Sequence, residues 1–152
     1  MPDLNPTPRG FSVFCDDIRE ETNNKASYIG VYTGVLLTYA PFPLTLPKFC
    51  IAVTYMQSPD DEMRPVKLKL LMDREGQESV VVLEGDIQAE AFDQLGPPDP
   101  LFSDPVRAAH MNIVLSPFTI EQECSLKVRA YYGDEEIKLG ALVVRSQPGS
   151  IA

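Results

Sequence analysis

The sequence predicts an all-β fold: an antiparallel β-sandwich, immunoglobulin- or C2-like, with about eight strands and at most one or two short helices. Three observations indicate this class. Runs of alternating apolar and polar residues recur roughly every ten to fifteen residues. Turn-forming residues separate most of these runs, and no long helical pattern alternates with them. Most connections are too short for a parallel crossover, so we expect antiparallel pairing.

Each expected strand places apolar residues at every second position, the period of a half-buried strand. The strands are expected at residues 11–16, 27–39, 48–57, 65–73, 80–83, 111–115, 124–132 and 137–143. The clearest alternation turns Lys67 and Lys69 to one face and aliphatic residues to the other. In the longest run, Gly30 and Gly34 share a face, which predicts a bulge or a close backbone approach.

The connections follow from turn chemistry. Residues 16–25 are charged and polar, with room for one helical turn at 18–22, and Asn23-Asn24 suits left-handed backbone angles. The proline-rich residues 41–47 lack the amide donors of a central strand, so they form an extended edge or crossover segment. Gly76 is expected at the left-handed position of a hairpin.

Later in the chain, residues 87–95 favour a short helix that Gly96 would end. The four prolines of residues 97–105 predict a loop.

The chain length predicts one domain over residues 1–152. Residues 1–9 are expected to be a flexible lead-in and residues 146–152 a polar tail. No signal peptide and no apolar run long enough to cross a bilayer is seen, which predicts a cytoplasmic protein.

The chain is acidic, with a formal net charge of -9. A nucleic-acid-binding surface or an anionic membrane contact would need cations, so we expect neither partner. The acidic balance serves solubility, or it mimics nucleic acid and occupies a basic groove.

Cys15, Cys50 and Cys124 lie in apolar strand-like runs without metal-ligand spacing, so we expect buried free thiols and neither a disulfide nor a zinc site. His110 is the only histidine. It is expected at a loop-to-strand boundary, with no Gly-x-Ser-x-Gly elbow, so we assign no catalytic residue. Phosphate-cradling glycine loops are also absent from the sequence, so no cofactor is expected.

The charged turn after the first strand is the main candidate site. Arg19 can hold the carboxylate of Asp16 or Asp17 through paired hydrogen bonds and clasp the turn. If that pair is buried, Arg19→Ala should cost about 3–5 kcal/mol of stability. If the turn is solvated, Asp16, Asp17, Arg19 and Lys25 form a binding site instead.

Two further alternatives stay open. Asp16-Asp17 and the acidic residues 60–62 each follow a strand, and loops from one end of a sandwich can converge on calcium. The six tyrosines could stack single-stranded nucleic acid, although the acidic balance favours packing. They are Tyr28, Tyr32, Tyr39, Tyr55, Tyr131 and Tyr132.

Three motifs carry a resemblance: Cys15-Asp16-Asp17-Ile18-Arg19-x-Glu21, then Asn24-Lys25-x-Ser27-x-Ile29-Gly30-x-Tyr32, then Leu46-Pro47-Lys48. In this order they resemble a family of small uncharacterised proteins encoded in bacteria and their phages. The resemblance covers mainly the first third of the chain. It implies a one-domain β protein, sometimes of phage or prophage origin, in the host cytoplasm or the virion.

These observations favour a non-enzymatic protein that acts through a protein partner or a second copy of itself, associated with a phage or prophage. The first alternative is a binding protein that sequesters a small molecule or nucleotide or acts as an inhibitor, with pockets between loops such as residues 16–25 and 97–105. The second is an enzyme with a metal or carboxylate site.

Overall fold

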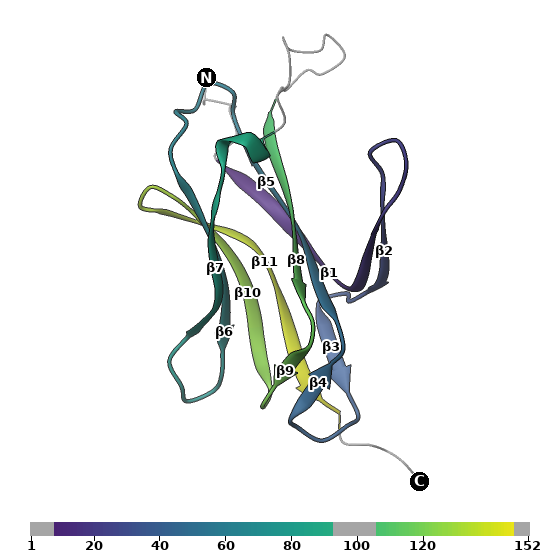
Figure 1. Cartoon of the computed structure of the whole chain (residues 1–152). Helices are drawn as coiled ribbons and strands as arrows, with labels where there is room; N and C mark the ends of the chain where they lie inside the picture. Colours follow the sequence, from purple (N-terminus) through teal and green to yellow (C-terminus); the bar gives the residue numbers. More distant parts are fainter. Residues whose placement is uncertain (1–7, 93–105, 148–152) are drawn as a thin grey trace.

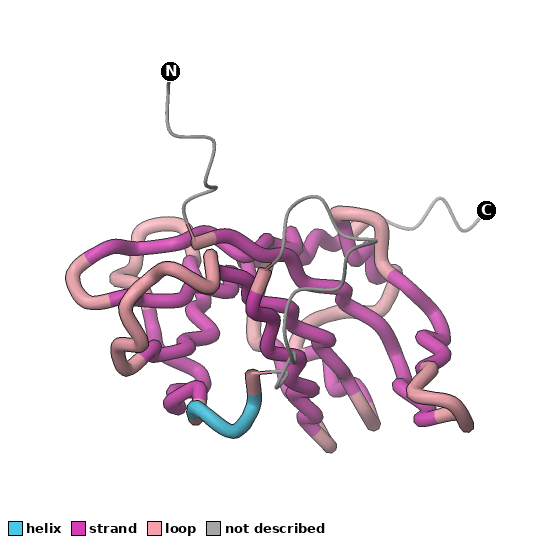
Figure 2. The backbone as a smooth tube through the Cα atoms, turned by 90° about the horizontal axis from the view of Figure 1, so that it is seen from above, coloured by secondary structure: helices cyan, strands magenta, loops and turns pink. Residues whose placement is uncertain are grey.

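The computed structural model describes residues 8–92 and 106–147, which form a β-sandwich of two sheets with a small two-stranded ribbon (Figure 1). The strands are β1 (Arg9–Glu20), β2 (Ala26–Val31), β3 (Val35–Thr38), β4 (Leu44–Leu46), β5 (Phe49–Gln57), β6 (Val66–Asp73), β7 (Val80–Ile87), β8 (Arg107–Leu115), β9 (Phe118–Ile120), β10 (Cys124–Tyr132) and β11 (Glu135–Ser146). The short 3-10 helix η1 (Ala89–Ala91) stands out among the strands in Figure 2. The predicted all-β class is therefore confirmed.

Sheet A has the strand order β2-β1-β5-β8, and sheet B has the order β3-β11-β10-β6-β7. Strands β4 and β9 form the ribbon. Strands β2 and β3 are consecutive in the chain but end up as edges of different sheets, both at the right of Figure 1. The edges at the other ends of the two sheets are β8 and β7.

One strand pair is parallel, which corrects the expectation of antiparallel pairing throughout. Val143 to Ser146 of β11 run parallel to β3. A parallel pair needs a long connection, and here most of the chain lies between the two strands. Short local connections could not predict this pair, because it joins strands that are distant in sequence.

The core lies between the inner faces of the two sheets. Phe49 and Tyr55 of sheet A and Leu126, Leu139 and Leu142 of sheet B are fully buried there. Phe49 stacks on Phe118 with ring centroids 5.4 Å apart, so the ribbon end packs on the same core. The alternation expected along β6 and β10 is confirmed, because their aliphatic positions face this core.

The described residues contain eleven strands where about eight were expected. The long run at residues 27–39 is two strands, since the chain leaves sheet A after Val31 and enters sheet B at Val35. The other two additional strands, β4 and β9, have only three residues each, too few for a recognisable alternation. The expectation that residues 41–47 are extended is confirmed by β4.

The helical turn expected at residues 18–22 is wrong. Strand β1 continues to Glu20, and Ile18 pairs with Tyr28 of β2. The hairpin gives these backbone groups partners on a second strand, which overrides a weak local helical preference. Asn23 and Asn24 do have positive φ angles, 62° and 57°, as predicted.

Of the other local features expected from the sequence, some are confirmed and others are not. Gly76 has a positive φ of 73°, which confirms its left-handed position. In the described part of the helix expected at residues 87–95, which ends at residue 92, only η1 is helical. Residues 93–95 and the loop expected at 97–105 lie outside the described residues. Arg9 and Ser146 belong to strands, so the lead-in expected at residues 1–9 and the tail expected at 146–152 do not include them. Residues 1–7 and 148–152 lie outside the described residues. The single-domain organisation stays a prediction.

Among the described residues, no helix has the length and apolar character to cross a membrane.

Candidate functional site

Residues 16–31, here called the arm, stand away from the rest of the sandwich in Figure 1. The arm comprises the second half of β1 and the whole of β2. Five of the six β2 residues are exposed, whereas β5 on the other side of β1 is almost entirely buried. This arm carries all four residues predicted to bind a partner.

Asp16 lies opposite Gly30 where the arm leaves the sandwich. The neighbouring pairs, Cys15 with Val31 and Asp17 with Ile29, are in regular antiparallel register. Gly30 has a φ of +68°, and a Cβ at this position would lie 2.2 Å from Asp16 Oδ2. The positive φ and this crowding both favour glycine. The close neighbour is the Asp16 side chain rather than a backbone segment, and a Cβ at Gly34 would have no atom within 4 Å, so the predicted close backbone approach is not found at either glycine.

Tyr32 ties Asp16 to the core. Its hydroxyl donates a hydrogen bond to Asp16 Oδ1 at 2.5 Å, and its ring packs on Phe49 with centroids 6.0 Å apart. Burial, and then the hydrogen bond to the Asp16 carboxylate, raise the pKa of Tyr32 above its ordinary value. The phenol therefore stays neutral and serves as a fixed donor.

Asp17 is held mainly by a lysine from another segment. Lys48 Nζ lies 2.6 Å from Asp17 Oδ1, whereas Arg19 Nε lies 3.7 Å from Asp17 Oδ2. The hydrogen bond from Lys48 is the largest of the effects that lower the pKa of Asp17, away from the neutral range. The predicted pairing of Arg19 with an aspartate is present, but the Arg19 side chain is 68% exposed. The burial on which a large contribution of Arg19 to stability depended is therefore not found.

The arm tip is closed by local contacts. The Glu21 amide donates to the Lys25 carbonyl at 2.8 Å, and the Ser27 hydroxyl donates to Glu21 Oε1 at 3.2 Å. Lys25 is exposed at this tip. Lys25 is four residues away from Ile29, the partner of Asp17, and each strand residue spans about 3.3 Å. Lys25 therefore lies apart from the arm base, the place where Asp16, Asp17, Gly30, Tyr32 and Lys48 meet.

The three motifs of the resemblance meet at the arm base. The first supplies Asp16 and Asp17, the second supplies Gly30 and Tyr32, and the third supplies Lys48. Reasoning from the sequence missed Tyr32 and Lys48 as site residues. Their presence in the quoted motifs was the available signal.

The carboxylates considered for calcium do not converge. In the β1–β5 register, Cys15 pairs with Cys50 at the start of β5, and residues 60–62 follow the other end of that strand. The nine residues of β5 span about 30 Å. The two acidic clusters therefore lie at opposite ends of the sandwich, which contradicts the convergence that this alternative required.

Cys15 and Cys50 face each other on the side of sheet A that is turned away from the core cluster, and both are fully buried. Both are free thiols, as is the buried Cys124, so the expectation of buried free thiols is confirmed. Burial raises the pKa of Cys15 to about 11 and also raises the pKa of Cys50. All three thiols are therefore poor nucleophiles in the folded chain.

His110 lies inside β8 rather than at a strand boundary, and its Nδ1 lies 3.1 Å from Thr54 Oγ1 on β5. The tyrosines do not gather into a platform. Tyr55 is buried and donates to Gln57 Oε1, and Tyr132 lies under the Arg64 guanidinium. Tyr28 and Tyr39 are exposed.

A second feature of this region is apolar. Six of the twelve large hydrophobic side chains that are exposed among the described residues fall within residues 28–39. This apolar edge, on β2, on β3 and directly after β3, consists of Tyr28, Ile29, Val31, Val35, Leu37 and Tyr39. Both strands are edges on the same side of the sandwich, so the six exposed residues belong to neighbouring edge segments of the two sheets.

A family model described as "Family of unknown function (DUF6941)" matches residues 10–145. The matched span begins in β1 and ends in β11, so it contains both the arm and the apolar edge. No curated protein and no solved structure matches the chain.

Proposed function

The chain belongs to the DUF6941 family of unknown function, and we propose that it is a non-enzymatic interaction protein whose protein partner docks on the apolar edge. The observation that carries the proposal is the concentration of exposed hydrophobic side chains within residues 28–39. Contiguous exposed apolar surface is costly in water and marks interaction sites in many proteins.

The composition of the edge supports this function. Tyr39 is 64% exposed and Leu37 is 51% exposed, although neighbouring Leu36 and Thr38 are buried. Tyrosine side chains, such as Tyr28 and Tyr39 here, are enriched at the energetic centres of interfaces, because each buries a large area at little entropic cost.

The charged arm residues supply a polar rim. Asp16, Asp17 and Arg19 lie at or near the arm base beside the edge, and Lys25 lies at the tip. Rim charges influence orientation and association rate more than affinity. The lowered pKa of Asp17 also moves it away from the range that a general acid or base would need.

Site-specific photocross-linking tests the proposal. We expect a photoreactive side chain at Leu37 or Tyr28 to give a discrete protein adduct in the native cell, or a covalent dimer of the purified chain. The control position is Lys138, which is exposed on the outer face of sheet B. Equal labelling from Lys138, or adducts that persist when Ile29 and Val31 are replaced by serine, would contradict docking at the apolar edge.

The resemblance to small proteins of bacteria and phages supports a phage or prophage origin as part of the same proposal. Neighbouring structural phage genes would favour a role in the virion, and early or defence genes would favour a regulatory or inhibitory role. A locus of ordinary metabolic genes in several genomes would count against phage association.

A further inference from the structure

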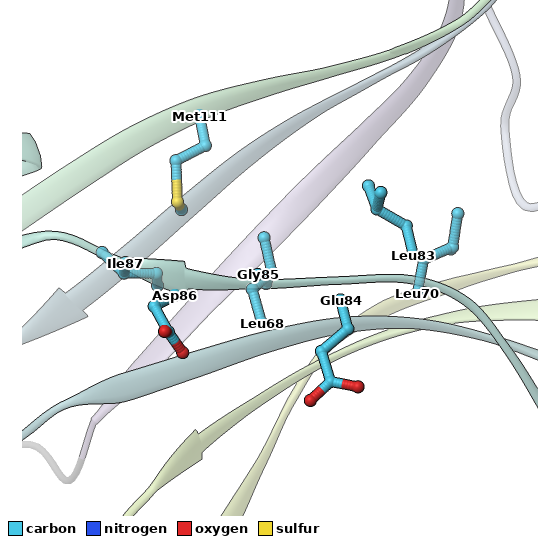
Figure 3. Close-up of a pocket in the computed structure, with 8 residues that line it drawn as sticks. All are labelled: Leu68, Leu70, Leu83, Glu84, Gly85, Asp86, Ile87 and Met111. Carbon is cyan, nitrogen blue, oxygen red and sulfur yellow. The ribbon is translucent and has the colours of Figure 1, made fainter.

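A small groove opens on the flank of the sandwich opposite the apolar edge, between β6, β7 and β8 (Figure 3). Its volume is about 240 Å³. The residues around it are Leu68, Leu70, Leu83, Glu84, Gly85, Asp86, Ile87 and Met111. In Figure 3 the side chains of Leu70, Leu83 and Met111 point into the space, whereas the two carboxylates point away from it. The interior of the groove is therefore apolar.

The groove exists because a side chain is missing. Gly85 lies opposite Leu68 on the core-facing side of β7, and a Cβ at Gly85 would have no atom within 4 Å. Leu83 beside it is 40% exposed. A larger residue at Gly85 would fill the opening between the sheets, so the glycine keeps it accessible.

Strand β7 is also a sheet edge, with no further strand paired to it within residues 8–92 and 106–147. It is the last strand of sheet B, and only Ile87 among its eight residues is buried. Val80 and Val81 are exposed large hydrophobic residues along with Leu83. An edge strand presents backbone groups that another extended segment can pair with.

The two faces of β7 have different chemistry. Leu83, Gly85 and Ile87 border the groove, whereas Glu84 and Asp86 lie on the outer face. A strand that pairs with β7 should therefore alternate aliphatic side chains on the groove side with cations on the outer side.

Strand β6, the partner of β7 on its other side, has this alternation. Lys67 pairs with Asp86, Leu68 with Gly85 and Lys69 with Glu84. Lys67 Nζ also lies 2.9 Å from Glu84 Oε1, and this contact lowers the pKa of Glu84. The free edge of β7 presents the same sequence of side chains to a second strand.

We propose that the free edge of β7 binds an extended protein segment in which large aliphatic and basic residues alternate. One aliphatic side chain enters the groove at Gly85, basic side chains lie near Glu84 and Asp86, and the backbones pair as neighbouring strands. The groove is smaller than the roughly 300–1,000 Å³ of typical small-molecule sites, which favours a side chain over a larger ligand.

The test uses the full chain and a labelled peptide of about eight residues that alternates valine and lysine. The matched peptides alternate valine and glutamate, or carry N-methyl groups on the amides of one strand edge. We expect the lysine peptide to bind at least about tenfold more tightly than either, with an affinity that falls as salt rises.

Two variants locate the site. Gly85→Leu should fill the groove and weaken the lysine peptide by about tenfold or more, with a urea melt as the check on folding. Asp86→Lys should shift the preference toward the glutamate peptide, and it serves as the second variant if Gly85→Leu fails to fold.

Several outcomes would overturn the proposal. These are equal binding of the lysine and glutamate peptides, unchanged binding of the N-methylated peptide, unchanged binding by a folded Gly85→Leu variant, and no peptide binding at all. If the peptide does not bind and a small apolar ligand binds in the groove instead, the site belongs to that ligand. A dimer abolished by Gly85→Leu, again without peptide binding, would assign it to a second copy.

Discussion

Tyr32 donates a hydrogen bond to Asp16 across the base of the arm, and the two oxygens are 2.5 Å apart. The same Tyr32 ring packs on Phe49 in the core. One side chain therefore connects the exposed arm to the buried interior.

Removing the Tyr32 hydroxyl should loosen the arm more than the core. Tyr32→Phe keeps the ring packing and loses one hydrogen bond, so we expect a loss of about 0.5–1.5 kcal/mol in unfolding free energy. Hydrogen exchange should accelerate at the amides of β2 and stay unchanged in β10. The same acceleration in both strands, or in neither, would mean that Tyr32 does not anchor the arm.

Gly30 should tolerate substitution less well than Gly34. Both have positive φ angles, 68° and 90°, so Ala at either position should cost about 1–3 kcal/mol in backbone strain. Gly30→Ala adds a clash with Asp16, whereas a Cβ at Gly34 has no atom within 4 Å. In an Asp16→Ala background, which removes the two closest Asp16 atoms and keeps the Asp16 Cβ, urea melts should show a smaller excess cost of Gly30→Ala over Gly34→Ala. Equal costs for the two glycine variants with Asp16 present would argue against the clash.

Lys48 should contribute more to stability than Arg19, because it is much closer to Asp17. Lys48→Met should therefore lower the urea midpoint more than Arg19→Ala. The pKa of Asp17 is lowered in the folded chain, so its contribution is present above the unfolded pKa near 3.8 and is lost as pH falls through the folded value. The difference in unfolding free energy between wild type and Lys48→Met should therefore vanish once the pH is below the folded pKa of Asp17. A larger effect of Arg19→Ala would restore the clasp hypothesis.

Neighbouring leucines on β3 provide a matched pair. Leu36 is 4% exposed and Leu37 is 51% exposed. Leu36→Ala should cost about 2–5 kcal/mol, because it leaves a cavity in the core. Leu37→Ala should change stability by less than about 0.5 kcal/mol and should instead weaken the proposed partner contact. A large loss of stability for Leu37→Ala would show that this side chain serves the fold.

Cys15 and Cys50 should resist alkylation in the native chain. Both are buried with raised pKa values, so few thiolates are present near neutral pH and reagent access is poor. Mass spectrometry after iodoacetamide treatment should show that the two cysteines are modified only as fast as the chain unfolds. Their rate of modification should rise sharply in urea. Rapid native labelling of one of these two cysteines would reveal local opening at the arm base.

Local patterns were sufficient for many of the strands. The alternation along β6 and β10 involves residues two apart, so it predicted their bounds to within a residue and correctly identified the core-facing side chains. The left-handed Asn23, Asn24 and Gly76 were equally predictable, because their backbone angles depend on residue type.

Exposure and long-range pairing could not be predicted in this way. Ile29 and Val31 belong to an apolar strand that alternation places in the interior, yet β2 lies at a sheet edge and leaves them in solvent. Asp17 forms an ion pair with Lys48, which is thirty-one residues away in the sequence. Gly85 borders a groove that also needs Met111 of β8. The all-β class, several strands and the motifs of the arm base were therefore predictable from local residue patterns. Which strands became sheet edges and which charged residues paired depended on contacts between segments that are distant in the chain.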